Sequence, residues 1–171
     1  MKIQTQLWLA VLISILSLTS SALATPRVDT NLPLFYAISD AFNDRLQFSL
    51  TVDDDSDVTG LIFSQNSGDT PIALADLPKG IVLYQSSGMD VVTLSSQNFN
   101  SQTGGDFTLK YLNNGISGTY RSFSFSVGRQ GQNWSPYILD SRQVPQVFVS
   151  MYLKAKKVLG KVVGIDSITL Q

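Results

Sequence analysis

The sequence of 171 residues contains no cysteine, no histidine and no glutamate, so all 13 of its acidic residues are aspartates. Without cysteine there is no disulfide scaffold and no lipoprotein anchor. Without histidine and cysteine the usual zinc sites and the Ser–His or Cys–His catalytic pairs are excluded. A general base would have to be Asp, Lys or Tyr, and the common serine-nucleophile and phosphate-loop motifs do not occur. The composition therefore predicts a protein that is not an enzyme.

Long apolar runs are also missing, apart from one near the N-terminus. Lys2 precedes the apolar residues 7–18, and a small-residue stretch follows that ends in Ala22-Leu23-Ala24. This order is typical of a secretory signal peptide, and the run is shorter than the roughly 20 residues that cross a bilayer. We therefore expect cleavage after residue 24, no transmembrane anchor in the mature chain, and a periplasmic, cell-surface or secreted location, in a bacterium.

The charge is close to balanced. The whole chain has a net charge of −1, which becomes −2 when Lys2 leaves with the signal peptide. Nucleic-acid binders and strongly cationic membrane binders carry an excess of Lys and Arg. We therefore expect no nucleic-acid partner. The partners expected are other envelope proteins, copies of the same chain, or a carbohydrate.

Alternation of apolar and polar residues is the strongest pattern in the mature chain. Apolar side chains fall at every second position in residues 45–52 and 107–111, and residues 121–127 alternate almost perfectly; these runs belong to the segments 106–112 and 118–127. A period of two is typical of a strand with one buried face. The sequence Asn113-Asn114-Gly115 lies between the last two runs and tolerates the positive φ angles of tight turns. The pattern predicts a β-hairpin there.

Further short strands are indicated between Gly, Asp, Asn and Pro residues. They are residues 61–64, 81–85, 91–95, 147–153, 158–163 and 165–170. Eight or more short strands at this spacing predict an all-β fold, a single antiparallel β-sandwich of the Ig-like or jelly-roll type, over residues 45–171. Gly160 and Gly164 favour bulges or bends near the C-terminus.

Residues 25–44 form an N-terminal extension whose structure the sequence leaves open. Its apolar residues fit two periods: Phe35, Ile38 and Phe42 have helical spacing, and Leu34, Tyr36 and Ile38 have strand spacing. The extension is therefore either a short helix or a strand. Such a strand would pair within this chain or be exchanged with another copy.

An acidic loop follows the strand at 45–52. Asp53, Asp55 and Asp57 copy the first three ligand positions of a calcium-binding loop. Val58 then stands where the loop requires glycine, and no glutamate is present to supply the bidentate ligand. A Ca²⁺ site that draws ligands from a second loop remains one interpretation. The favoured one is a solvated turn whose charge discourages aggregation of the sheet end.

Residues 128–137 read as a loop that carries the single tryptophan of the mature chain. Trp134 and Tyr137, together with Asn133 and Arg129, could form a platform for a carbohydrate, because aromatic faces stack on sugars and amides bond their hydroxyls. The alternative is that Trp134 closes one end of the sandwich. A separate basic cluster could bind an anion or protect a strand edge. It consists of Lys154, Lys156, Lys157 and Lys161.

Size, composition and strand pattern together favour an exported, non-catalytic envelope protein that acts through protein–protein contact. In outline the mature chain resembles the subunits of bacterial surface fimbriae that lack a disulfide. The resemblance implies β-augmentation, in which an N-terminal extension adds a strand to the neighbouring subunit. Pro26 and Pro33 cannot donate to a ladder, which leaves residues 34–39 as the donor. The alternative is a carbohydrate- or calcium-binding module.

Overall fold

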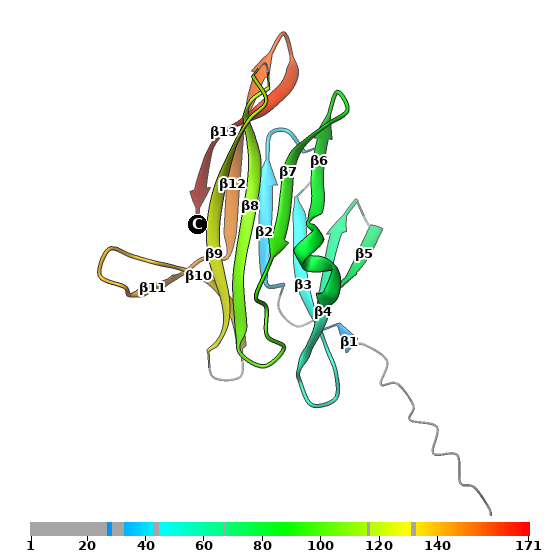
Figure 1. Cartoon of the computed structure of the whole chain (residues 1–171), viewed down its shortest axis with the longest axis vertical. Coiled ribbons are helices and arrows are strands. Elements are labelled where there is room, and N and C mark those ends of the chain that lie inside the picture. The colour runs from blue at the N-terminus through cyan, green and yellow to red at the C-terminus, as the bar shows by residue number, and fades with distance from the viewer. Residues whose placement is uncertain (1–26, 29–32, 43–44, 67, 116, 131–132) are drawn as a thin grey trace, which may run out of the picture.

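Two β-sheets that lie face to face make up almost all of the described structure (Figure 1). The computed structural model describes residues 27–28, 33–42, 45–66, 68–115, 117–130 and 133–171. All pairings between neighbouring strands but one are antiparallel among these residues, and the predicted all-β class is confirmed. The expected signal peptide, residues 1–24, lies outside the described residues.

The first sheet has the strand order β13-β12-β2-β3-β4-β5, and β1 pairs with the end of β3. The exceptional parallel pair is β2 with β12. The strands of this sheet are β1 (Arg27–Val28), β2 (Phe35–Ser39), β3 (Leu46–Val52), β4 (Val58–Gln65), β5 (Gly68–Ala73), β12 (Ser150–Val158) and β13 (Lys161–Leu170).

The second sheet has the order β11-β10-β9-β8-β7-β6. Its strands are β6 (Ile81–Ser86), β7 (Met89–Ser96), β8 (Gly104–Asn114), β9 (Thr119–Gln130), β10 (Asn133–Leu139) and β11 (Pro145–Val147). The chain crosses from the first sheet to the second through a 3₁₀ helix, η1 (Leu74–Lys79), and returns between β11 and β12. Among the described residues, no helix has the length and apolar character needed to span a bilayer.

Aromatic side chains from both sheets form the centre of the core. Phe35 of β2 stacks on Phe48 of β3 with ring centroids 4.4 Å apart, and its ring meets Phe125 of β9 edge-on at 5.3 Å. Phe125 in turn stacks on Phe107 of β8 at 5.5 Å. Phe148, in the connection between the sheets, contacts both Phe35 and Phe125. The apolar positions of the alternating segments therefore do form the inner faces of the sandwich.

The N-terminal extension contributes a strand to its own first sheet. β2 lies between β12 and β3, so both of its edges are paired within the chain. The backbone N–H of Tyr36 donates to the carbonyl of Val149 at 3.0 Å, and the hydroxyl of Ser39 donates to the carbonyl of Leu153 at 2.6 Å. Of the two structures that the sequence allowed for this segment, the chain forms the strand, and it pairs in cis. The predicted alternation is on the wrong face, because Phe35 and Ala37 are buried whereas Tyr36 and Ile38 are half-buried.

The two sheets converge closely at the end where β13 crosses β8. A Cβ atom on Gly164 would overlap the carbonyl oxygen of Leu112, and one on Gly115 would overlap the carbonyl oxygen of Val163. The side-chain amide of Asn113 also donates to the carbonyl of Ile165 at 3.1 Å. Glycine is required here because the two backbones touch.

The predicted strand boundaries near the C-terminus are wrong in detail. The expected strands 158–163 and 165–170 form one strand, β13, which follows a tight turn at Leu159 and Gly160, both with positive φ. The expected strand 147–153 is interrupted between β11 and β12. Register shifts on both sides of the pair Lys156–Gly164 show that β13 is bulged around Gly164.

The stretch 128–137, expected as a loop, is mostly strand, and the prediction of a loop there is wrong. Residues up to Gln130 complete β9, and β10 begins at Asn133. Pro136 lies within β10, but its carbonyl accepts the N–H of Phe148 at 3.2 Å, which shows that its polar backbone edge faces away from β9. The ladder between β9 and β10 therefore loses no hydrogen bond to the proline.

Candidate functional site

The hairpin of β10 and β11 projects from the body of the sandwich as an arm (Figure 1). We use the name "arm" for residues 137–147. The first part of β10 pairs with β9, up to Tyr137 opposite Ser126. From Tyr137 onward β10 pairs with β11 instead, which brings Tyr137 opposite Val147 and Leu139 opposite Pro145. The arm thus diverges from the second sheet at Tyr137.

The turn at the tip of the arm is built around Asp140. Its carboxylate accepts the backbone N–H groups of Arg142 at 2.8 Å and Val144 at 2.9 Å. The hydrogen bond from Val144 lowers the pKa of Asp140 most; desolvation opposes it, and the two bonds from Arg142 lower the pKa further. Gln143 has a φ of 63°, which this turn imposes. The arm is therefore held in shape by its own aspartate.

Apolar side chains on the arm are unusually exposed. Leu139, Val144 and Val147 expose 50%, 45% and 51% of their surface. Val149, just before β12, exposes 65%. Directly opposed residues in a ladder point to the same face, so Leu139 and Pro145 lie on the same face as Tyr137 and Val147. This face of the arm is continuous with the outer face of the second sheet.

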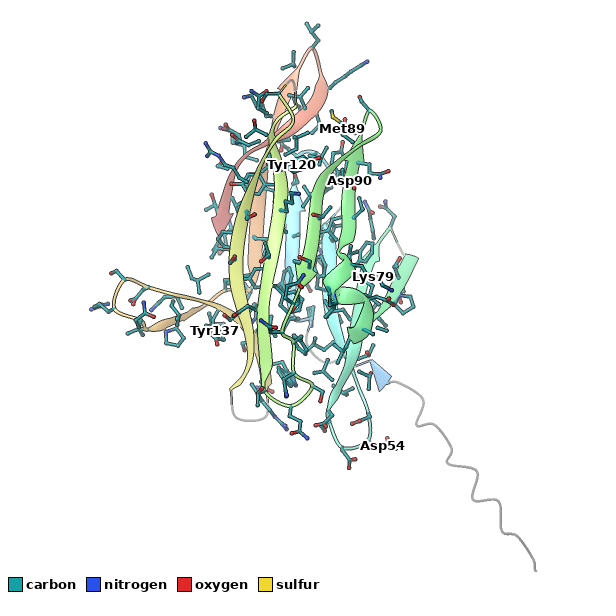
Figure 2. The ribbon with its side chains drawn as sticks, in the orientation of Figure 1. Asp54, Lys79, Met89, Asp90, Tyr120 and Tyr137 are labelled. Atoms are coloured by element: carbon teal, nitrogen blue, oxygen red, sulfur yellow. The ribbon has the colours of Figure 1, made fainter. Side chains whose placement is uncertain are left out.

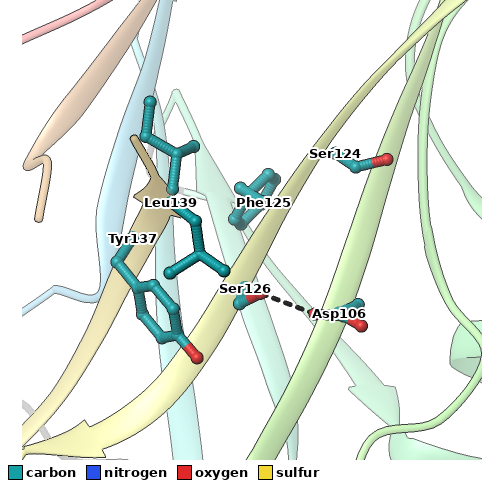
Figure 3. A pocket seen from close by; sticks show the side chains of 7 residues that line it. Asp106, Ser124, Phe125, Ser126, Tyr137 and Leu139 are labelled. Atoms are coloured by element: carbon teal, nitrogen blue, oxygen red, sulfur yellow. Dashed lines mark hydrogen bonds between the residues drawn. The ribbon is translucent and has the colours of Figure 1, made fainter. Parts of the chain in front are cut away.

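A hollow of about 300 Å³ lies in the angle between the arm and the second sheet. One wall is the arm, with Tyr137, Ile138 and Leu139, and the other wall is the outer face of β8 and β9 (Figure 3). That second wall consists of Asp106, Ser124 and Ser126 on the outer face and of Phe125, whose ring faces the core. The volume of the hollow is at the lower end of the range for small-molecule sites. We call this feature the arm hollow.

Two contacts fix the polar groups of the arm hollow. The hydroxyl of Ser126 donates to one carboxylate oxygen of Asp106 at 2.5 Å, across the β8–β9 pair. Tyr137 lies on the other side of the hollow from this pair (Figure 3). Its ring lies against the backbone of β9, because a Cβ on Gly128 would come within 3.1 Å of a ring carbon. Glycine at that position leaves room for the ring beside the sheet.

The structure separates the residues that the sequence grouped into one platform. Trp134 and Tyr137 are three positions apart in a strand, so they face opposite sides of the sheet. Trp134 stacks on Phe99 at 6.2 Å and packs against the core, at one end of the sandwich. Asn133 and Arg129 are exposed near the end of the β9–β10 hairpin and do not line the arm hollow. Of the four predicted residues, Tyr137 alone lines the hollow.

The acidic loop is organised by its own backbone. One carboxylate oxygen of Asp53 accepts the N–H groups of Asp55 at 3.0 Å and Asp57 at 2.9 Å. The carboxylate of Asp57 accepts a hydrogen bond from Gln102 at 3.1 Å. Within the described part of the chain, no three acidic side chains lie close enough together to hold a metal ion. The three aspartates form a turn at one end of the molecule, where Asp54 is labelled (Figure 2).

The basic cluster lies on the hairpin of β12 and β13. Lys154 forms an ion pair with Asp166 at 3.8 Å, and Lys157 forms one with Asp40 at 3.8 Å. Lys154, Lys156 and Lys157 are on β12, which is an inner strand between β13 and β2. The pairing of β12 with β2 ends at Leu153, however, so these lysines lie beyond it, where that edge of β12 has no partner strand among the described residues. Protection of a strand edge by these lysines stays a prediction.

Among the residues of the arm hollow that sequence reasoning missed are Asp106 and Ser126, which form its polar contact. Both lie at polar positions of the predicted hairpin, and the alternation does place them on its outer face. A pairing register for that hairpin would have put them opposite each other. No local pattern indicates that Tyr137 would lie beside them, because that depends on where β10 leaves β9.

Comparison with known proteins adds no assignment. The chain matches no protein-family model, no curated protein and no solved structure.

Proposed function

We propose that this protein is an exported, non-catalytic envelope module that acts through protein–protein contact, and that the arm is its contact element. The observation that carries the proposal is the exposure of Leu139, Val144 and Val147 on a projecting hairpin. Exposed apolar side chains that gather on one feature are typical of interaction sites. The composition supports the non-catalytic part, and the N-terminal sequence pattern supports export.

The contact is expected to use side chains more than strand addition. β11 is the outer strand of its sheet, but it has three residues and begins with Pro145. Short edge strands and proline both hinder pairing with a further strand. The exposed valine and leucine side chains of the arm are therefore the better candidates for contact.

Assembly in the manner of fimbrial subunits would require a rearrangement of this structure. β2 is hydrogen-bonded on both edges within its own chain. A neighbour could supply that strand if the same segment left its sheet, which is a domain swap. We therefore place the proposed contact on the arm, where no rearrangement is needed.

The proposal is tested by photo-crosslinking in cells that produce the protein. A photo-reactive phenylalanine analogue replaces Val144 at the tip of the arm, and in a matched variant it replaces Val82. Val82 exposes 41% of its surface on β6, at the opposite edge of the same sheet. We expect a discrete protein adduct from position 144 and none of that mass from position 82. Equal adduct patterns at both positions, or none from 144, would contradict the proposal.

A further inference from the structure

Besides its exposed valines, the arm forms one wall of an open, partly polar hollow at its base. The arm hollow combines an aromatic ring, an aliphatic wall and an aspartate on the paired strands β8 and β9. From these groups we propose that the arm hollow binds one unit of a neutral saccharide. This inference does not depend on the proposed protein contact.

Tyr137 supplies the apolar surface for the sugar ring. It is half-buried, with its ring beside Gly128 on one side and the hollow on the other. Leu139, on the same face of the arm, extends this surface away from the sheet. One face of a pyranose carries mainly C–H groups, and these pack on an aromatic ring as other apolar groups do. The contact with Gly128 restricts the ring before binding, which lowers the entropy lost on binding.

Asp106 supplies the acceptors for sugar hydroxyls. A carboxylate has about four lone-pair sites and accepts only, and Ser126 occupies one of them. The second carboxylate oxygen of Asp106 receives no hydrogen bond among those found for the described residues, and the side chain is exposed. Two neighbouring hydroxyls of a sugar can donate to such a carboxylate. Hydrogen bonds to a charged acceptor are stronger than neutral ones.

A cationic ligand fits the same groups less well. An exposed ion pair contributes little in water, about 0–1 kcal/mol, and Asp106 is the sole acidic side chain among the described residues that line the arm hollow. The same face of β8 also carries Lys110, four positions along the strand from Asp106. Ser126, by contrast, adds a hydroxyl that suits a polyhydroxylated ligand. A neutral sugar therefore matches more of the wall than an ammonium group does.

The hollow also does not match a glycosidase. Enzymes that hydrolyse glycosides use a pair of carboxyl groups on either side of the scissile bond. Within the described lining there is a single carboxylate, Asp106. We therefore expect the saccharide to be bound and released unchanged.

The test uses the intact mature chain, labelled with ¹⁵N, in an NMR titration. The probes are neutral tetrasaccharides of glucose, galactose, mannose and N-acetylglucosamine, and tetralysine as a cationic probe. We expect saturable shifts from at least one tetrasaccharide at the amides of residues 106, 124–126 and 137–139. Saturation by tetralysine alone would overturn the assignment of the ligand. The absence of saturable shifts from every tetrasaccharide up to about 20 mM, a limit set for weak single-site binding, would overturn the site.

Three variants separate a specific site from general contact with the sheet. Tyr137→Ala is expected to weaken binding about tenfold, as loss of an aromatic contact and its buried area predicts. Tyr120→Ala is the matched control, because Tyr120 lies on the same sheet far from Tyr137 (Figure 2) and does not line the hollow. Asp106→Asn removes the charge at an exposed position on β8. It therefore tests the site even if Tyr137→Ala disturbs the arm. Tyr120→Ala should bind as tightly as the unchanged chain. If Tyr137→Ala and Asp106→Asn also bind as tightly as the unchanged chain, the proposal is wrong.

Discussion

The carboxylate of Asp40 accepts the backbone N–H of Ala155 at 2.7 Å, across 115 positions of the sequence. Asp40 directly follows β2, and the regular parallel pairing of β2 with β12 ends one residue earlier, at Ser39 and Leu153. The side chain therefore continues the ladder where the backbone stops. The carbonyl of Asp40 also accepts a hydrogen bond from Lys157 at 2.9 Å. Together these contacts fix the N-terminal strand against a strand near the C-terminus.

Removal of this link should destabilise the fold. For Asp40→Ala we expect a loss of about 1–2 kcal/mol in the free energy of unfolding, as for a hydrogen bond to a charged group that is partly exposed. Asp40→Asn keeps an acceptor and should lose about half as much. Urea titration measures both. The control is Asp166→Ala, which removes only the exposed ion pair with Lys154, and an equal loss in Asp40→Ala and Asp166→Ala would contradict this role.

The close approach of β13 and β8 predicts a strong effect of a single methyl group. Gly164→Ala would place a Cβ against the carbonyl oxygen of Leu112, and the backbones would have to separate. We expect a loss of about 1–3 kcal/mol or more, as in overpacked cores. Gly68→Ala is the control, because its Cβ would meet its nearest atom at 3.4 Å. Thermal unfolding of the two variants should differ clearly, and similar melting temperatures would disprove the close contact.

Burial distinguishes two phenylalanines of β9 that the sequence treats alike. Phe125 exposes 3% of its surface and contacts Phe35, Phe107 and Phe148, whereas Phe123 is half-buried. Phe125→Ala should cost about 3–5 kcal/mol, as for other fully buried aromatic residues. Phe123→Ala should cost clearly less. Chemical denaturation of both variants provides the measurement, and the reverse order would mean that the centre of the core is assigned to the wrong position along β9.

The turn of the arm should depend on pH through Asp140. Its hydrogen bond from the N–H of Val144 lowers its pKa below the ordinary value of 3.8. A group whose pKa is lowered by folding stabilises the fold above its unfolded pKa. The stabilisation by Asp140 is therefore complete at pH values above the pKa of the unfolded chain, and it is lost as the pH falls through the lowered pKa of the folded protein.

An NMR titration of the Asp140 carboxyl group measures this shift. We expect it to titrate at lower pH in the folded protein than in a synthetic peptide of residues 138–146, and the amide of Val144 should follow the same curve. Coinciding titration curves in the protein and the peptide would show that the turn does not protect the carboxylate.

Export can be examined directly from the mass of the protein recovered outside the cytoplasm. We expect the chain to begin at Thr25, because the A-x-A pattern ends at Ala24. Replacement of Ala24 by a bulky residue such as Phe should leave the full-length precursor. A recovered chain that still begins at Met1, with Ala24 unchanged, would rule out the proposed signal peptide.

The sequence by itself determined the fold class, most strands and the inner face of the core. The segments of β3, β8 and β9 could be predicted because alternation is a local property that follows from burial of one face. Phe48, Phe107 and Phe125 are core residues for that reason. The wrong predictions near the C-terminus concern only where strands begin and end. The sequence offers several possible turn positions there, and the structure has the turn at Leu159–Gly160.

Only the tertiary structure decided which strands are neighbours and what the sheets bring together. The extension could form a helix or a strand, and its place depended on β12, more than 100 residues away. Pro136 argued against a strand at the position of β10. The structure accommodates it because the backbone polar groups of Pro136 face away from β9. Once that segment is a strand, Trp134 and Tyr137 must face opposite sides. Tyr137 and Asp106 then line opposite walls of the arm hollow, because long-range pairing sets that arrangement and local pattern does not.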